Sequence, residues 1–83
     1  MQQTKDQNSA VTELDASGLK CPMPVLRANR ALRNVAPGGL LRVRATDPAA
    51  QADFPSFCQT TGHALVEAKA EDDAWVFLLR KKS

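Results

Sequence analysis

The segment Leu19-Lys20-Cys21-Pro22-Met23-Pro24 contains the residue best suited to chemistry, a cysteine followed closely by two prolines. Pro22 disfavours the α conformation at Cys21 and keeps the cysteine outside a following helix, while Pro22 or Pro24 suits the first helical turn. Cys21 is therefore predicted at or just before the N-cap of a helix, facing the positive end of the helix dipole. This position favours the thiolate, the nucleophilic form of sulfur, and the adjacent Lys20 adds positive charge.

The chain offers Cys21 no obvious partner base. His63 is the only histidine, and it follows Gly62, which ends a second predicted helix, so we interpret it as a partly exposed loop residue. A plain capping role is the alternative for Cys21, but cysteine caps helices poorly beside Ser, Thr, Asn or Asp. Without a base or a predictable pocket, Cys21 fits a carrier better than a hydrolytic nucleophile, since a carrier accepts a group from one protein and passes it to another.

Cys21 also allows two other interpretations. Cys21-Pro22 could be a haem-binding dipeptide, with the thiolate as axial ligand. Alternatively, Cys21 could belong to a thiol peroxidase or redox sensor, which needs an accessible resolving thiol. Cys58 shares an apolar helical face with Phe54 and Phe57, so we expect Cys58 to lie in the core.

Residues around the cysteine have predicted supporting roles. The composition of the segment Asp15-Ala-Ser-Gly18 is typical of a turn. Gly18 is free to take a positive φ, and the Asp15 carboxylate can order the loop through an Asx-type contact. Arg27, Arg30 and Arg33 form a basic stripe on the first predicted helix. Such stripes are usually solvated, but Arg27 and Arg30 lie near Cys21 and are predicted to meet an acidic partner surface.

Apolar spacing predicts the elements that position these residues. Alternation predicts strands over 11–14, 40–46, 64–70 and 74–80. Spacings of three and four, from Val25 to Val35, predict a first helix that ends at Pro37-Gly38-Gly39. A second helix ends at Gly62; Asp47-Pro48 is a good start for it, although Pro55 allows a later start at Asp53.

The predicted order of elements is β-α-β-α-β-β. This order favours an α/β (α+β) two-layer sandwich, in which two helices cover one face of a four-stranded mixed sheet. Residues 1–10 are predicted to be a flexible N-terminal tail, and residues 11–83 a single domain. The tail has no apolar stretch of a secretory signal, and no segment is apolar enough for a membrane helix, so we expect a cytoplasmic protein.

Composition excludes several classes of protein. The chain has 83 residues, a formal net charge of +2 and 5% aromatic residues, which argues against a multidomain enzyme and against direct nucleic-acid binding. Two cysteines and one histidine are too few for a disulfide scaffold or a closed zinc site. We therefore expect no metal, no cofactor and, for a small carrier with transient interfaces, a monomer.

The chain resembles the TusA/SirA-like sulfur carrier family, whose signature is Leu-Asp-x-x-Gly-Leu-x-Cys-Pro-x-Pro. The matching segment here is Leu14-Asp15-Ala16-Ser17-Gly18-Leu19-Lys20-Cys21-Pro22-Met23-Pro24. Further matches are Asp47-Pro48-Ala49, Asp53-Phe54-Pro55-Ser56-Phe57-Cys58 and Gly62-His63-Ala64-Leu65. Met23 occupies the variable position, where the member devoted to tRNA thiolation resembles Cys-Pro-Glu-Pro. An acidic residue beside the sulfur would steer a particular partner, and this chain departs from that pattern.

The resemblance implies a β-α-β-α-β-β fold and a persulfide carrier. The cysteine matching Cys21 would accept sulfane sulfur from a cysteine desulfurase or rhodanese-like donor. It would then pass this sulfur to an acceptor protein, as in tRNA thiolation, molybdenum cofactor biosynthesis or sulfur oxidation. The alternative within the family is a regulatory protein-interaction module, in which the Arg27/Arg30 face and the Cys21 loop bind a partner without sulfur transfer.

Overall fold

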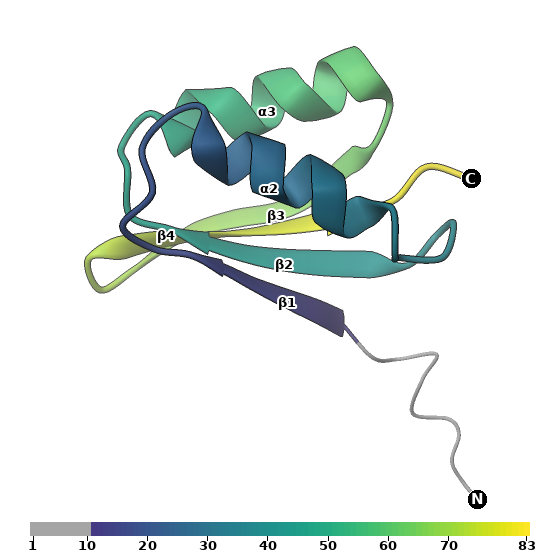
Figure 1. Ribbon diagram of the computed structural model, residues 1–83, viewed down its shortest axis with the longest axis horizontal. Helices are drawn as coiled ribbons and strands as arrows, with labels where there is room; N and C mark the ends of the chain where they lie inside the picture. The colour runs from purple at the N-terminus through teal and green to yellow at the C-terminus, as the bar shows by residue number, and fades with distance from the viewer. Residues whose placement is uncertain (1–10) are drawn as a thin grey trace, which may run out of the picture.

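The computed structural model describes residues 11–83, so the predicted N-terminal tail lies outside the described residues. The helices and strands follow the predicted order (Figure 1). Their bounds are β1 (Val11–Ala16), α2 (Met23–Leu32), β2 (Leu40–Ala45), α3 (Ala50–Thr61), β3 (Ala64–Glu71) and β4 (Ala74–Arg80). Both helices cover one face of a four-stranded mixed sheet, which confirms the predicted two-layer sandwich.

The sheet has the strand order β1-β2-β4-β3. β1 and β2 run parallel, whereas β4 runs antiparallel to both β2 and β3. The first crossover between parallel strands carries α2, and α3 connects β2 to the β3–β4 hairpin. The carboxyl ends of β1 and β2 therefore meet at one edge of the sheet, and the loops that lead into the two helices leave from this edge.

The core lies between the sheet and the two helices. Its largest fully buried side chains are Phe54 of α3 and Phe77 of β4, whose rings stack with centroids 4.6 Å apart. The buried residues of α2 are Pro24, Ala28 and Leu32, of which Ala28 and Leu32 belong to the predicted apolar stripe. The open face of the sheet is charged, and Arg42 pairs there with Glu13 at 2.6 Å.

The helix boundaries differ from the prediction in two places. α2 ends at Leu32, and Val35 is buried beyond the helix in the turn that precedes β2. α3 begins at Ala50, after Asp47-Pro48 and before Asp53, so neither predicted start is correct. The Asp47 carbonyl accepts the Ala50 N–H at 2.9 Å and the Pro48 carbonyl accepts the Gln51 N–H at 3.2 Å, so a tight turn leads from Asp47 directly into the helix.

Within the described part of the chain, no helix combines the length and apolar character that a membrane crossing requires. The longer of the two helices, α3, has 12 residues.

Candidate functional site

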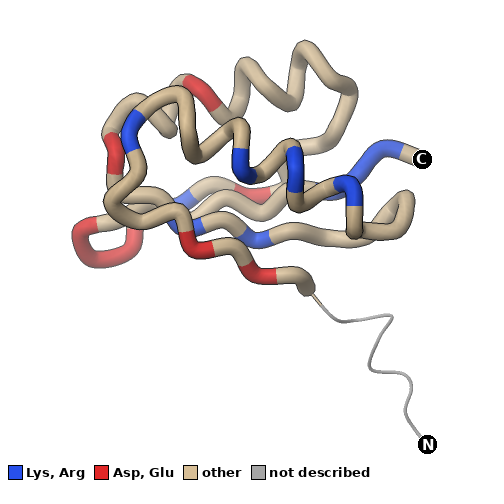
Figure 2. The backbone as a smooth tube through the Cα atoms, in the orientation of Figure 1, with Lys and Arg blue, Asp and Glu red and all other residues tan. Residues whose placement is uncertain are grey.

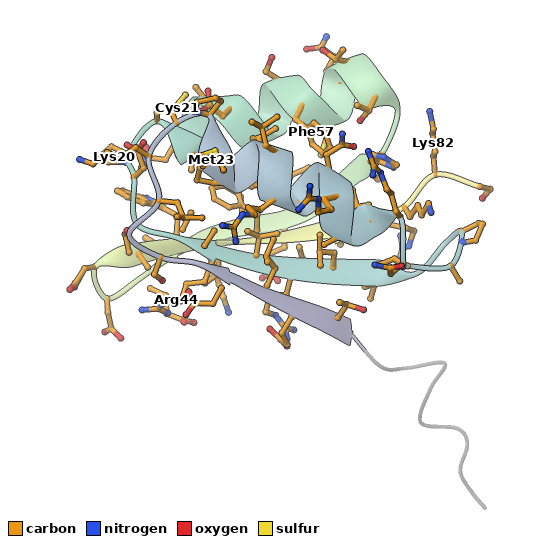
Figure 3. All side chains as sticks on the ribbon, in the orientation of Figure 1. Lys20, Cys21, Met23, Arg44, Phe57 and Lys82 are labelled. Carbon is orange, nitrogen blue, oxygen red and sulfur yellow. The ribbon has the colours of Figure 1, made fainter. Side chains whose placement is uncertain are left out.

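Cys21 lies on the surface at the start of α2, as the sequence predicts (Figure 3). Pro22 is the N-cap of α2, so Cys21 is the last residue before the helix. The Met23 N–H donates to the Lys20 carbonyl at 2.8 Å, which closes a tight turn around a cis Cys21-Pro22 peptide. Pro24 is buried in the first turn of α2, where its missing N–H leaves no hydrogen bond unmade. These contacts fix the backbone that presents the thiol.

Asp47 holds the Cys21 backbone from the neighbouring loop. The Cys21 N–H donates to Oδ2 of Asp47 at 2.6 Å, and the Ala49 N–H donates to Oδ1 of the same carboxylate at 3.2 Å. These two hydrogen bonds lower the pKa of the Asp47 carboxyl, and the charge of Lys20 contributes in the same direction. Asp47 therefore joins the β1–α2 loop to the β2–α3 loop instead of capping α3.

The thiol of Cys21 is in a different electrostatic environment from the one predicted. The Asp53 carboxylate, which lines the same groove as the thiol, raises the pKa of Cys21 above its usual range, and desolvation and the negative charge of Asp47 act in the same direction. This direction is opposite to the one expected from the helix dipole and Lys20, which would favour the thiolate. Two nearby carboxylates outweigh a helix terminus, whose effect is modest at an exposed site. Acidic segments of the β2–α3 loop and of α3 lie at this end of the molecule (Figure 2).

The predicted supporting residues order the loop before the cysteine. The Asp15 carboxylate accepts hydrogen bonds from the Ser17 N–H at 3.0 Å and from the Ser17 hydroxyl at 2.6 Å, which is the predicted Asx-type contact and lowers the Asp15 pKa. Gly18 has φ +81°, and its N–H donates to Oγ1 of Thr46 at 2.8 Å. The loop is therefore attached to the carboxyl end of β2 on both sides of Lys20.

Gly18→Ala is expected to destabilise the fold because of this backbone conformation. A Cβ at Gly18 would meet no atom within 4 Å, so the cost comes from the left-handed conformation and not from crowding. That conformation costs an alanine about 1–2 kcal/mol, which equilibrium urea unfolding would measure. Gly18→Asn is the control, since asparagine tolerates positive φ and should recover part of the loss. Equal stability of the alanine variant and the wild type would contradict this interpretation.

A shallow groove, absent from the sequence prediction, opens beside the thiol. Its volume is about 290 Å³, and its lining includes Cys21, Pro22 and Val25 from the start of α2 and Asp53, Ser56, Phe57 and Thr60 from α3. Phe57 is half-buried and packs against the core as well as lining the groove. The periodicity of α3 placed Phe57 on the apolar face, and both helices were predicted on one face of the sheet, but the sequence did not show which residues of α2 would lie beside Phe57.

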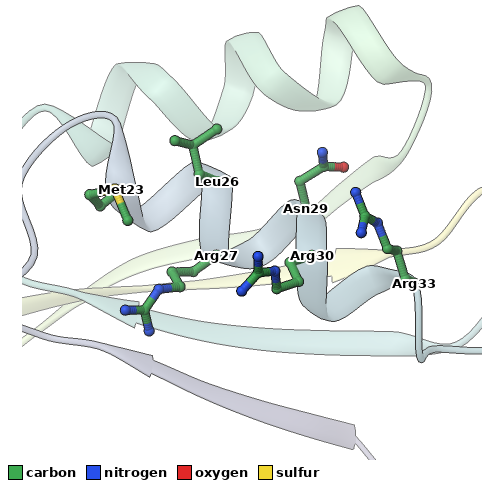
Figure 4. Close-up of a pocket in the computed structure, with 6 residues that line it drawn as sticks. All are labelled: Met23, Leu26, Arg27, Asn29, Arg30 and Arg33. Atoms are coloured by element: carbon green, nitrogen blue, oxygen red, sulfur yellow. The ribbon is translucent and has the colours of Figure 1, made fainter.

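The outer face of α2 carries the predicted arginine stripe. Met23, Leu26, Asn29 and the three arginines line a depression of about 310 Å³, with the apolar pair nearer the N-terminal end of the helix (Figure 4). Met23 is 38% exposed and Leu26 51% exposed, and the two side chains together form an apolar patch on the helix surface. An apolar and basic surface therefore begins two residues after Cys21.

The remaining candidate residues lie away from this site. Cys58 is buried in the core, as predicted, and burial raises the pKa of its thiol. His63 lies beyond the C-terminal end of α3, where its Nδ1 accepts the Lys82 N–H at 3.1 Å; desolvation, with the charges of Lys82 and Lys81, lowers its pKa. Residues 11–83 contain no cluster of three or more His, Cys, Asp or Glu side chains arranged to hold a metal ion.

Known proteins resemble the chain over most of its length. Residues 12–81 match the family described as Sulfurtransferase TusA. The sulfur carrier protein TusA of Pseudomonas aeruginosa is 49% identical over 70 residues, which cover 84% of this chain and 89% of that protein. The protein of the same name from Pseudomonas syringae is 48% identical over 71 residues, covering 86% and 84%.

A solved structure shares the fold. The SirA-like protein of Desulfitobacterium hafniense superposes with a TM-score of 0.75 at 21% identity, over 89% of this chain and all of that one. The fold and the site together define a class of small two-layer α/β sandwiches that display one exposed cysteine at a helix start. Within that class, the chain belongs to the TusA family, as the match over residues 12–81 and the relatives at 48–49% identity show.

Proposed function

We propose that the protein is a sulfur carrier that holds sulfane sulfur as a persulfide on Cys21. The observation that carries the proposal is the exposed thiol, which lies just before the N-cap of α2 on a backbone held by Asp47 and by the Lys20–Met23 turn. Family membership supports the same function, since the relatives at 48–49% identity are sulfur carrier proteins. A carrier needs a sulfur that other proteins can reach, because its partners supply the active sites.

Transfer to Cys21 follows the chemistry of thiol–disulfide exchange. The Cys21 thiolate attacks the outer sulfur of a donor persulfide, a new sulfur–sulfur bond forms, and the donor cysteine leaves as a thiolate. Release runs the same step in reverse direction, with an acceptor thiolate attacking the outer sulfur on Cys21. Access and ionisation of the thiol are the requirements. The exposure of Cys21 supports access, while the negative charges of Asp53 and Asp47 raise the pKa of its thiol and oppose ionisation.

The partners are a cysteine desulfurase or rhodanese-like donor and a downstream acceptor protein. We assign Arg27 and Arg30 to partner binding, because their guanidinium groups line the depression on α2 that begins beside the cysteine. The same depression includes the exposed Met23 and Leu26. Apolar side chains bordered by arginines are suited to a partner surface that is itself apolar at the centre and acidic at the edge.

The function is tested by intact-protein mass spectrometry. The protein is incubated with a cysteine desulfurase and cysteine, and separately with inorganic polysulfide. We expect a gain of one sulfur atom, located on Cys21 by peptide mapping and removed by a reductant. A chain that gains no sulfur from either donor, or that gains it elsewhere, would reject the proposal.

Charge reversal on α2 is expected to slow loading by a protein donor. Arg27→Glu/Arg30→Glu places negative charge where we expect an acidic partner, so loading by the desulfurase should slow roughly tenfold at low salt. Arg80→Glu is a control for the change of charge, because Arg80 is exposed at the end of β4. Loading by polysulfide should not change in either variant. Equal desulfurase rates for the double variant and the wild type would show that α2 does not face the donor.

A further inference from the structure

The segment that follows β4 returns to the helical layer and binds there at the ends of both helices. The Lys81 ammonium donates to the Val35 carbonyl at 2.9 Å, in the turn beyond α2. The Lys82 ammonium donates to the Thr61 carbonyl at 2.7 Å, at the last residue of α3. The last carbonyls of a helix have no partner within the helix, and cations are favoured at this negative end of its dipole. Two consecutive lysines therefore hold the helix ends that lie opposite Cys21 (Figure 3).

His63 joins the same segment to the end of α3. The Lys82 backbone N–H donates to Nδ1 of His63 at 3.1 Å, so this nitrogen is an acceptor and the ring is neutral. The His63 ring is tilted against the Phe57 ring, with the two centroids 5.8 Å apart. Phe57 and Thr61 also line the groove that begins at Cys21. The contacts of the segment after β4 therefore reach the far end of that groove.

The charged groups that act on the His63 ring are cationic. Desolvation, together with the charges of Lys82 and Lys81, lowers the pKa of this ring. Arg80 ends β4, the strand next to β3 in the sheet. The last turn of α3 carries no charged side chain, and Glu67 is the first acidic residue of β3. The segments around His63 therefore oppose an imidazolium and favour the neutral ring that the hydrogen bond requires.

We propose that His63 is a pH-sensitive latch: the neutral ring holds the segment after β4 on α3, and protonation of Nδ1 releases this segment. Once Nδ1 takes up a proton from solvent, it cannot accept a hydrogen bond, and two N–H groups then face each other. The imidazolium also adds a positive charge beside Lys82 and Lys81. Release of the Lys82 backbone frees the Thr61 carbonyl from its ammonium, so the last turn of α3 loosens. The latch does not depend on sulfur transfer and would operate in a protein of any function.

The latch is closed at neutral pH and opens in mild acid. In the folded protein the pKa of His63 lies below its ordinary value of 6.5, so the unfolded chain binds the proton more tightly than the folded chain. The stabilising contribution of the neutral ring is therefore complete above pH 6.5 and declines as the pH falls below that value. Since His63 is the only histidine, the end of α3 should be the first part of the fold to lose order as the solution becomes acidic.

An NMR titration of the full chain without a histidine tag tests the latch. The single imidazole signal reports the pKa of His63, which should lie below 6.5. The protection of the Lys82 amide against hydrogen exchange, corrected for the intrinsic rate, should fall about two- to tenfold between neutral and mildly acidic pH. Lys82→Gln keeps the backbone N–H and removes one cation, so the His63 pKa should rise, while Lys69→Gln on the exposed part of β3 is the matched control. A wild-type pKa at or above 6.5, or a Lys82 amide that does not respond to pH, would overturn the proposal.

Two further variants separate the hydrogen bond from the charge. His63→Asn keeps an acceptor close to the position of Nδ1 and cannot be protonated, so the Lys82 amide should stay protected at both pH values. Lys82→Pro removes the N–H as well as the cation, and its His63 pKa should rise above that of Lys82→Gln. Thermal unfolding at neutral pH checks that each variant is folded, and His63→Asn decides the matter if the proline variant is not. A loss of Lys82 protection in acid that persists in His63→Asn would overturn the latch.

Discussion

Cys21→Ser is expected to abolish sulfur loading completely, whichever donor is used. A serine hydroxyl cannot form the sulfur–sulfur bond that stores sulfane sulfur, and its proton is far harder to remove than that of a thiol. The fold should not change, because Cys21 is exposed and its backbone N–H, which Asp47 binds, is retained. Intact mass after incubation with a cysteine desulfurase and cysteine, or with polysulfide, measures the result.

Cys58→Ala is the matched control for this experiment. Cys58 is 5% exposed and lies in the core, so its thiol is not accessible to a donor. The alanine variant should therefore load one sulfur atom on Cys21 at the wild-type rate, with a modest loss of stability from the lost packing. Two outcomes would show that Cys21 does not carry the persulfide: sulfur gain that persists in Cys21→Ser, or sulfur gain that disappears in Cys58→Ala while the protein remains folded.

The same pair of variants separates the carrier from the other interpretations of Cys21. A regulatory interaction module would retain partner binding and its phenotype in Cys21→Ser. A peroxide sensor that resolves through Cys58 would form a disulfide between the two cysteines, and the burial of Cys58 argues against this. Only the carrier requires the sulfur atom at position 21 and no second thiol.

The parts of the site that depend on residues close to Cys21 along the chain could be predicted from the sequence. Pro22 and Pro24 predict a cysteine just outside a helix, and the structure places Cys21 immediately before the N-cap. Gly18 predicts a turn with positive φ, and the observed angle is +81°. The fold could be predicted for the same reason. Strand alternation and helical spacing are local patterns, and tertiary packing did not override them here.

The ionisation of Cys21 could not be predicted in this way. The local contributions, Lys20 and the helix dipole, both favour the thiolate, but the decisive groups lie on another loop and helix. Asp47 reaches the Cys21 N–H across 26 residues of sequence. A signal did exist: if the first two strands are parallel neighbours, the loops that follow them share one sheet edge. That argument would have brought Asp47 to Cys21, although it could not have shown that Asp53 and Cys21 line the same groove.

The start of α3 was missed for a related reason. Asp47-Pro48 has the composition of a helix N-terminus, but the Asp47 carboxylate is already engaged by the Cys21 backbone. The helix instead begins at Ala50 with no side-chain cap, and Asp53 falls in its first turn. Asp47, which is suited to capping, instead joins the two loops. With the helix starting at Ala50, Asp53 of its first turn lines the groove beside the thiol.

The position of α3 depends on Phe54, and Phe54→Ala is expected to cost about 3–5 kcal/mol of unfolding free energy. The Phe54 side chain is fully buried, and its ring stacks on Phe77 at an interplanar angle of 21°. A domain of this size has about 4–12 kcal/mol in total, so the variant should be partly or wholly unfolded at 37 °C. Equilibrium urea unfolding, compared at constant m-value, measures the loss.

Leu26→Ala provides the control, because it also removes a large apolar side chain from a helix. Leu26 is 51% exposed, so its truncation should change the unfolding free energy by no more than about 0.5 kcal/mol. The two variants should therefore affect different properties. Phe54→Ala loses stability, while Leu26→Ala keeps its stability and loses affinity for a protein donor. Similar stability losses in both would mean that Leu26 is needed for packing, and the apolar surface on α2 could not be assigned to a partner.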